Sequence, residues 1–279
     1  MKYLLPLLLI STAFVGCNIQ RLPTQMAYRH PARKPQQTFP VSNGKLAAHV
    51  SGGTDRNTIT LSDTTFPINH HDGENCVGTL YIDDMNGGKV SAYQRVLRID
   101  SGIVRDRYTR NGATYAREYF ASRPDKVIAI RLKAQPAGTL NSNIILTSPW
   151  PHAAKVSQGQ ITMTGYAPGD PKESVHFCSV VRVSHSGGTM ARTDTSLIVT
   201  GATEAIVYYV NATSFNGHDK HHVREGAPYI ENAMDDAWHL VNFTYDSLLT
   251  RHPRDIGERP VSRRQSRRAI GNNQSTTAR

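Results

Sequence analysis

Short apolar runs that alternate with polar residues recur from about Val41 to Ser214, and they constrain the fold of this chain more than any other feature. Successive side chains of a β-strand point to opposite faces, so alternation is typical of a half-buried strand. Gly, Asn, Asp and Pro separate the runs, as in turns. The strand candidates include KVIAIRLKA, NSNIILTS, QITMTG, SVHFCSVVRVSHS, TSLIVTG and EAIVYYVNATS. With no long helical pattern between them, they predict an all-β fold, a large antiparallel two-sheet β-sandwich.

The clearest local unit is IVRDRYTRNGATYAREYFAS, in which two alternating runs flank Asn111-Gly112. A two-residue hairpin turn needs positive φ at both central residues, and Asn-Gly adopts it readily. The unit therefore predicts an antiparallel hairpin. In the run SVHFCSVVRVSHS one face would carry Val175, Phe177, Val181 and Val183, and the other would carry His176, Cys178 and Arg182. We expect the first face to be buried and the second to be wetter.

The pattern changes after the last strand candidate. From Tyr229 to Arg251, apolar residues recur at intervals of three and four, which is typical of an amphipathic helix. They are Ile230, Met234, Ala237, Val241, Tyr245 and Leu248. Pro253 would end this helix. The sequence therefore predicts a sandwich over residues 39–227 and one linker helix over 228–252.

The N-terminus has the pattern of a secretion signal. Lys2 precedes an apolar stretch over residues 3–15, and Phe14-Val15-Gly16-Cys17 resembles a bacterial lipobox. Residues 1–17 are then a lipoprotein signal peptide, with Cys17 as the lipid attachment point. Residues 18–38 are polar and rich in Pro, Gln and Arg, and they indicate a flexible tether. We expect an exported protein, anchored to the bacterial membrane on the periplasmic side or at the cell surface.

No metal site, cofactor site or catalytic residue is predicted. The histidines of INHHDGEN (68–75) and FNGHDKHHVREG (215–226) lie in Gly- and Asn-rich loops without metal-ligand spacing. Asp83-Asp84 and Asp235-Asp236 are adjacent pairs whose side chains diverge, so neither pair can flank a glycosidic bond. Cys76 and Cys178 remain in the mature chain, where free thiols are favoured over a disulfide.

The formal net charge of +10 is concentrated in the C-terminal tail, where eight Arg against Asp255 and Glu258 leave about +6. Nucleic-acid binding requires cations arranged over a folded surface, so no nucleic-acid partner is expected. Residues 253–279 lack apolar periodicity and should be disordered. An abrupt change to unpatterned, Arg-rich sequence is typical of a shifted reading frame, so we expect a truncated gene product.

Several motifs resemble the N-terminal domain of glycoside hydrolase family 95, the α-L-fucosidases. The first is FPVSNGKLAAHVSGGTDRNTITLSDTT, where Ser42 and Ala47 replace glycines of the family pattern. The second block is more specific, and it consists of Tyr93-Gln94-Arg95, Leu97, Asp100, Gly102, Val104, Tyr108, Gly112, Tyr115, Arg117-Glu118, Phe120-Ala121-Ser122, Pro124-Asp125 and Arg131-Leu132. Ala212-Thr213-Ser214-Phe215 also fits.

This resemblance implies a β-sandwich joined through linker helices to an (α/α)6 barrel that carries the catalytic residues and acts on fucosylated glycans. No catalytic residue of the family falls on a position of this chain. Contacts with the barrel or with the substrate cleft are expected at Asn43, Gly44, Thr213 and Ser214. The alternative hypotheses are a carbohydrate-binding or adhesion lipoprotein, for which Trp150 and Trp238 offer few aromatic platforms, and a small enzyme with an unrecognised site in the sandwich.

Overall fold

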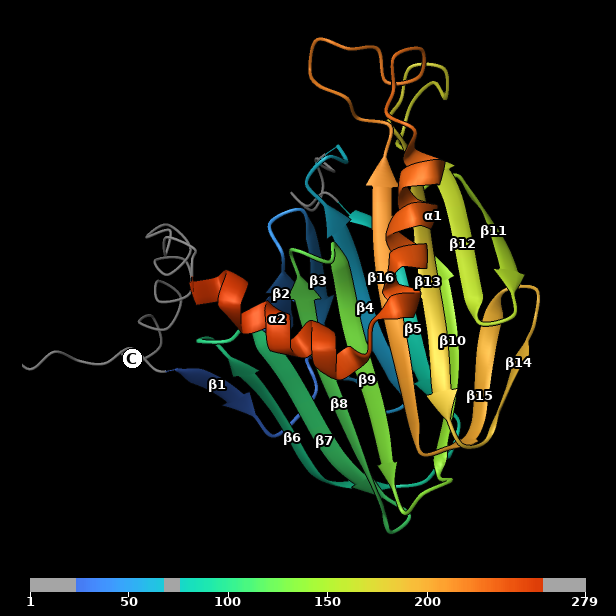
Figure 1. Cartoon of the computed structure of the whole chain (residues 1–279). Coiled ribbons are helices and arrows are strands. Elements are labelled where there is room, and N and C mark those ends of the chain that lie inside the picture. The colour runs from blue at the N-terminus through green and yellow to red at the C-terminus, as the bar shows by residue number, and fades with distance from the viewer. Residues whose placement is uncertain (1–23, 68–75, 258–279) are drawn as a thin grey trace, which may run out of the picture.

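Two antiparallel β-sheets packed face to face form the body of the protein (Figure 1) in a computed structural model that describes residues 24–67 and 76–257. The nine-stranded sheet has the order β1 (Gln25–Tyr28), β6 (Val90–Arg98), β7 (Ile103–Arg110), β8 (Ala113–Ser122), β9 (Val127–Gln135), β16 (Glu204–Thr213), β13 (His176–Ser186), β12 (Gln160–Tyr166) and β11 (His152–Ser157). The seven-stranded sheet has the order β14 (Thr189–Arg192), β15 (Ser196–Ala202), β10 (Leu140–Thr147), β5 (Cys76–Asp84), β4 (Arg56–Asp63), β3 (Leu46–Val50) and β2 (Phe39–Ser42). The predicted all-β sandwich is confirmed.

The alternation seen in the sequence positions the core between the sheets. In β10 every second residue is buried, and the same holds in β3 and β4. The predicted hairpin is β7–β8, with Arg110 opposite Ala113 across the turn. Asn111 and Gly112 both have positive φ, 50° and 77°, as this turn requires.

The folded domain begins earlier than predicted. Residues 25–28, expected in a flexible tether, form β1, which pairs with β6. Tyr28 packs against Phe39, and the guanidinium of Arg95 lies over both rings. β1 is short and mostly exposed, so it lacks the apolar alternation that would have revealed it. A 3-10 turn, η1 (Pro35–Gln37), follows.

The segment predicted as one helix forms two. These are α1 (Tyr229–His239) and α2 (Tyr245–Gly257), separated by the 3-10 turn η2 (Leu240–Asn242). Thr244 starts the second helix, because its side-chain hydroxyl accepts a hydrogen bond from the Ser247 N–H, as an N-cap does. Pro253, expected to end the helix, lies within α2; proline removes one helical hydrogen bond, and the helix continues beyond it here.

The helices cover the outer face of the nine-stranded sheet, α1 over β13 and β16 and α2 over β8 (Figure 1). The face of β13 predicted to be wetter is therefore buried at Cys178. Ala233 and Ala237 face the sheet, and their small side chains allow close approach. The larger Ile230, Met234 and Val241 of the predicted stripe remain exposed.

A buried polar cluster, centred on the carboxylate of Asp106, lies between the sheets. The Arg117 guanidinium contacts Asp106 at 2.6 Å, and the Tyr119 hydroxyl donates to its other oxygen at 2.9 Å. Asn57 of the opposite sheet donates to the Tyr119 oxygen, and Arg117 reaches the Gly53 carbonyl. Burial disfavours the charge of Arg117, but the Asp106 carboxylate together with the hydroxyls of Tyr119 and Tyr108 outweighs that effect, so the pKa of the guanidinium is raised.

Contacts next to this cluster explain two family-like motifs, the Gly52-Gly53 pair and Tyr93-Gln94-Arg95. The Tyr93 hydroxyl donates to the Gly52 carbonyl, and the Arg95 side chain lies against the same glycine. A Cβ at Gly52 would overlap both side chains, and one at Gly53 would overlap the Arg56 carbonyl. The Gly-Gly pair and the Tyr-Gln-Arg motif are thus packing partners across the sandwich.

The signal peptide with Cys17, the histidine cluster at 68–75 and the tail from 258 onward lie outside the described residues. Among the helices of residues 24–67 and 76–257, none combines the length and apolar character needed to cross a membrane.

We expect Asp106→Ala to lower the free energy of unfolding by about 3–5 kcal/mol, because it leaves the buried Arg117 without its carboxylate. Urea unfolding followed by circular dichroism measures the change. Asp100→Ala is the control, since that exposed carboxylate pairs with Arg98 at the surface, where ion pairs contribute little. Equal loss of stability in both variants would contradict the role assigned to Asp106.

Candidate functional site

The predicted contact residues Asn43, Gly44, Thr213 and Ser214 lie at one end of the sandwich. Asn43 and Gly44 form the turn between β2 and β3, whereas Thr213 ends β16 and Ser214 follows it. The Asn43 side-chain amide donates to the Ser122 carbonyl of the opposite sheet, at 3.0 Å. The structure therefore brings the two predicted pairs to the same end of the molecule.

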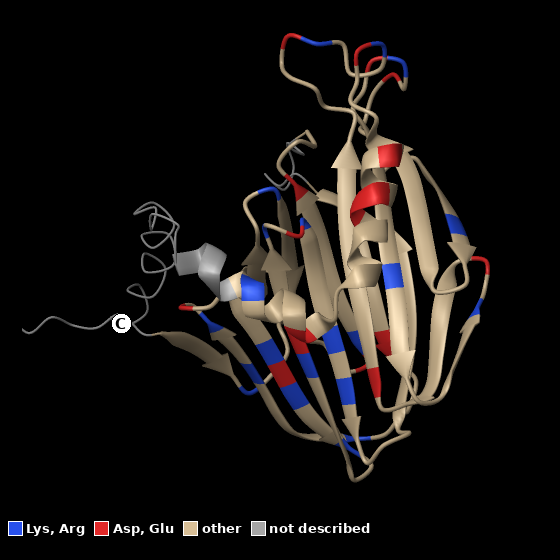
Figure 2. Ribbon diagram, in the orientation of Figure 1, with Lys and Arg blue, Asp and Glu red and all other residues tan. Residues whose placement is uncertain are grey.

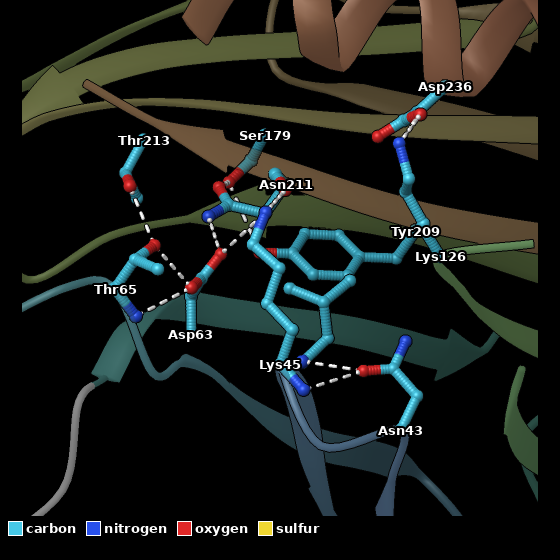
Figure 3. Close-up of polar contacts among 11 residues, drawn as sticks. Asn43, Lys45, Asp63, Thr65, Lys126, Ser179, Tyr209, Asn211, Thr213 and Asp236 are labelled. Atoms are coloured by element: carbon cyan, nitrogen blue, oxygen red, sulfur yellow. Dashed lines mark hydrogen bonds and ion pairs between the residues drawn. The ribbon is translucent and has the colours of Figure 1, made fainter. Parts of the chain in front are cut away.

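The fully buried carboxylate of Asp63 lies at the centre of this end (Figure 3). It accepts hydrogen bonds from the Asn211 amide at 2.8 Å, the Thr65 hydroxyl at 2.6 Å and the Thr65 N–H at 2.9 Å. The Lys45 ammonium lies 3.5 Å from Asp63 and donates to the Asn211 carbonyl at 3.0 Å. Asp63 and Asn211 belong to different sheets, so this network joins them.

The network continues into the nine-stranded sheet through Ser179, whose hydroxyl donates to the Asn211 side chain at 2.7 Å and lies 3.2 Å from the Tyr209 hydroxyl. Burial raises the pKa of Tyr209 well above its ordinary value, so this phenol stays protonated. At the edge of the network opposite Ser179, the Thr65 and Thr213 hydroxyls are 2.6 Å apart.

This arrangement is suited to holding structure and not to proton transfer. A general acid or base must face the substrate within hydrogen-bonding distance. Asp63 is instead enclosed, and both of its oxygens receive donors from the protein. The network therefore fixes the shape of this end of the sandwich.

The four predicted contact residues differ in exposure. Asn43, Thr213 and Ser214 are buried, and the Ser214 hydroxyl accepts from the His176 N–H. Gly44 is exposed and has a φ of 93°. Direct contact with another domain or with substrate stays a prediction for all four. Asn43, Thr213 and Ser214 hold the turns at this end of the sandwich from inside.

Two loops, 166–176 and 214–228, project from the same end (Figure 1). His221 joins them, because its Nδ1 accepts from the Val223 and Arg224 N–H groups while its Nε2 lies 3.0 Å from a Glu173 oxygen. His218 and His222 pack on Phe215. Across the described ranges, no group of three or more His, Cys, Asp or Glu side chains could hold a metal ion.

The adjacent carboxylates diverge as predicted. Asp83 pairs with Arg56 on the outer face of its sheet, whereas Asp84 faces Arg110 and accepts from the Tyr108 hydroxyl. In the described part of the chain, Cys76 is half-buried and Cys178 is buried, and no disulfide joins them. Burial raises the pKa of the Cys178 thiol to about 11.

Sequence reasoning missed Lys45, Asp63 and Asn211, although a signal was present. The inner face of β4 reads Asn57, Ile59, Leu61, Asp63, so a carboxylate continues an apolar stripe. A charge on a buried face requires partners, and two of those of Asp63 lie close in sequence, namely Thr65 and Lys45, which precedes β3. The partner from β16 could not be found this way, since it lies 148 residues away.

The two-sheet architecture, with two helices on the larger sheet, is that of a glycoside hydrolase N-terminal β-sandwich domain. The chain belongs to the family described as glycosyl hydrolase family 65, N-terminal domain, which it matches over residues 65–218, more than half of its 279 residues. The resemblance carried by the sequence motifs, to the N-terminal domain of a glycoside hydrolase, is thus confirmed.

The chain is also similar to individual proteins. Alpha-L-fucosidase 2 of Arabidopsis thaliana is 21% identical over 311 aligned positions, which cover 85% of this chain and 36% of that protein. A putative kojibiose phosphorylase from the human microbiome has the same fold, with a TM-score of 0.50 and 11% identity, over 85% of this chain and 38% of that chain. A family GH92 alpha-mannosidase from Bacteroides thetaiotaomicron matches at a TM-score of 0.37 and 10% identity, over 79% and 34%. The chain spans little more than a third of the length of these relatives.

We expect Asp63→Ala to speed amide hydrogen exchange at Thr65 and at the end of β16, because the Thr65 N–H and the Asn211 side chain lose their shared acceptor. Exchange measured by mass spectrometry, peptide by peptide, tests this. Asp83→Ala removes a carboxylate from the outer face and should leave those peptides unchanged. Protection that survives Asp63→Ala would show that Asp63 does not hold this end together.

Proposed function

We propose that this chain is the N-terminal β-sandwich domain of an α-L-fucosidase-like glycoside hydrolase that acts on terminal α-L-fucosyl glycans. Its similarity to Alpha-L-fucosidase 2 over 85% of its own length supports this substrate class. Catalysis in such an enzyme would come from an (α/α)6 barrel, and the sandwich by itself would not hydrolyse fucosides. Its role would be to support the barrel and to position the turns around Gly44 beside it.

The observation that carries this proposal is an exposed apolar stripe, defined by Ile230, Met234, Trp238 and Val241, along α1 and η2. Trp238 is 67% exposed, and Phe243 beyond the stripe is also exposed. The buried side of the same helix already packs on the sheet through Ala233 and Ala237. Contiguous apolar side chains on a soluble surface mark an interaction site. A second domain packed on the stripe would bury it.

We also propose that the protein is an exported bacterial lipoprotein, held to the membrane through Cys17. The support is the signal-like sequence of residues 1–17 and its lipobox-like ending. Diacylation of Cys17 would provide a stable anchor, since two acyl chains hold a protein at a membrane where one does not. An enzyme for extracellular glycans would be placed there to meet its substrate.

We expect the purified chain to release no fucose from 4-nitrophenyl α-L-fucoside or from fucosylated oligosaccharides. An inverting hydrolysis requires an acid and a base positioned on opposite sides of the glycosidic bond, and we assign both to the barrel. Chromatography of the products gives the measurement. Fucose release that disappears when one carboxylate of this chain is replaced would overturn the assignment. Binding of fucosylated glycans without hydrolysis would favour the carbohydrate-binding or adhesion lipoprotein instead.

We expect a clickable fatty acid fed to cells that express the chain to label the wild type and to spare Cys17→Ser. The reason is that the Cys17 thiol would receive the diacylglycerol. Gel fluorescence after the click reaction measures the label, and Cys76→Ser is the matched control that should label like the wild type. Equal labelling of Cys17→Ser and the wild type would show that Cys17 carries no lipid.

A further inference from the structure

The part of the nine-stranded sheet's outer face that the helices leave open carries cations on β7 and β9, the strands on either side of β8 (Figure 2). Residues two apart in a strand point to the same face, so the outward-facing residues of neighbouring strands line up in parallel rows across the sheet. The register defines the upper row as Val96, Arg105, Glu118, Arg131 and Ile206. It defines the lower row as Gln94, Arg107, Ala116, Lys133 and Glu204.

The upper row is balanced internally. Glu118 stands between Arg105 and Arg131, and its carboxylate contacts the Arg105 guanidinium at 2.5 Å. Arg131 pairs in addition with Asp246 at the start of α2. The like charges of two arginines are therefore separated by a carboxylate, as favourable cross-strand pairing requires.

The lower row lacks the corresponding carboxylate. Ala116 stands between Arg107 and Lys133, in the position that Glu118 occupies in the upper row. Lys133 pairs with Glu204 on its other side at 3.0 Å. The Arg107 side chain is exposed, and within residues 24–67 and 76–257 it makes no hydrogen bond or ion pair. Two cations therefore flank a small, exposed side chain with open space above it.

The surface around Ala116 is hollow. One hollow of about 440 Å³ extends from Ala116 toward Gln94 and Arg98, and another of about 450 Å³ extends toward Thr114, Gln135 and Thr203. Arg107, Ala116 and Lys133 line both of them. A third hollow, of about 390 Å³, shares Glu204 with the second and Arg131 with the first. Together they form a furrow across β6 to β13, about 24 Å long if neighbouring strands are about 4.8 Å apart.

The lining of this furrow selects the class of ligand. The two hollows beside Ala116 contain no aromatic side chain on which the face of a neutral sugar could stack, whereas Tyr208, Phe243 and Tyr245 line the third hollow. They offer instead hydroxyl and amide groups, which suit sugar hydroxyls, next to Arg107 and Lys133, which suit an anionic group. The furrow also has the length of a short oligosaccharide.

We infer that the furrow binds an acidic oligosaccharide, and that a carboxylate or sulfate of one sugar lies over Ala116 between Arg107 and Lys133. The ligand's anion would complete the lower row as Glu118 completes the upper one. This inference rests on the register and charges of the open sheet face, and it holds whether or not the chain is part of a fucosidase.

The experiment is calorimetric titration of the purified full chain with three probes of matched length. They are oligogalacturonate, which carries a carboxylate on each sugar, sulfated dextran oligosaccharide and uncharged dextran oligosaccharide. Ala116→Glu is the diagnostic variant, because it supplies the missing carboxylate from the protein and removes no interaction. Arg107→Gln removes the unpaired cation. Lys172→Gln, in an exposed loop distant from the furrow, changes the net charge by the same amount as Arg107→Gln and serves as its control.

We expect at least one acidic probe to bind and the uncharged one not to bind. Ala116→Glu and Arg107→Gln should each weaken binding at least about tenfold, the worth of one charge-assisted contact, while Lys172→Gln should not. Unchanged melting curves would show that the variants are folded.

Four results would overturn the inference. They are no binding of either acidic probe, equal binding of the uncharged probe, undiminished binding by Ala116→Glu, and an equal loss with Lys172→Gln, which would indicate nonspecific charge attraction. Carboxylate and sulfate sources are distinguished by which acidic probe binds more tightly. As a fourth probe, duplex DNA of equal charge gives a fifth such result if it binds more tightly than either acidic oligosaccharide.

Discussion

One strand, β4, holds both ends of the sandwich together. Its inner face presents Asn57, Ile59, Leu61 and Asp63 in order, so that two apolar residues fill the middle of the core and a polar residue stands at each end. Asn57 reaches Tyr119 and, through it, the buried Asp106; Asp63 receives Asn211 from the opposite sheet. Apolar packing between sheets has no directional preference, whereas these bonds form at one relative position only. They therefore determine how the sheets are placed with respect to one another, and with them the turns and loops at each end.

The outer face of the nine-stranded sheet is shared by the packed side of the helices, the exposed apolar stripe of α1 and the open strands that carry charge. Small residues on α1 let the helix lie close to β13 and β16, and Tyr245 and Leu248 of α2 fill the space over β8. The same close approach turns the larger apolar residues of α1 outward. The strands beyond the helices stay open and carry charge. A helix that packed through its largest side chains would stand further from the sheet and would expose no apolar stripe.

The sequence contained enough to predict the sandwich, the β7–β8 hairpin and the relationship to glycoside hydrolase N-terminal domains, because alternation and Asn-Gly turn chemistry are local signals. What it could not show is which distant residues meet. β1 carries no alternation of its own and is defined by its pairing with β6. The break between the helices had a local signal in Thr244, but the choice of Ala233 and Ala237 as the buried side depends on the sheet beneath them. Of the candidate site, the sequence could point to the four turn residues through the resemblance, whereas the Asp63 network requires the fold to bring together strands that lie far apart in sequence.

The apolar stripe and the furrow meet on this face. The hollow that contains Leu240 and Val241 also contains Arg131 and Glu204, the residues through which it adjoins the two cationic hollows. A domain packed on Trp238 and Val241 would therefore stand beside the furrow and form one of its walls. Enclosing the furrow would exclude water from it and strengthen the attraction between its cations and a bound anion. The pairing of Arg131 with Asp246 ties the charged row to the first turn of α2, the helix that follows the stripe in the chain. A ligand that competed for Arg131 would therefore disturb the contact between the charged row and α2, next to the apolar stripe.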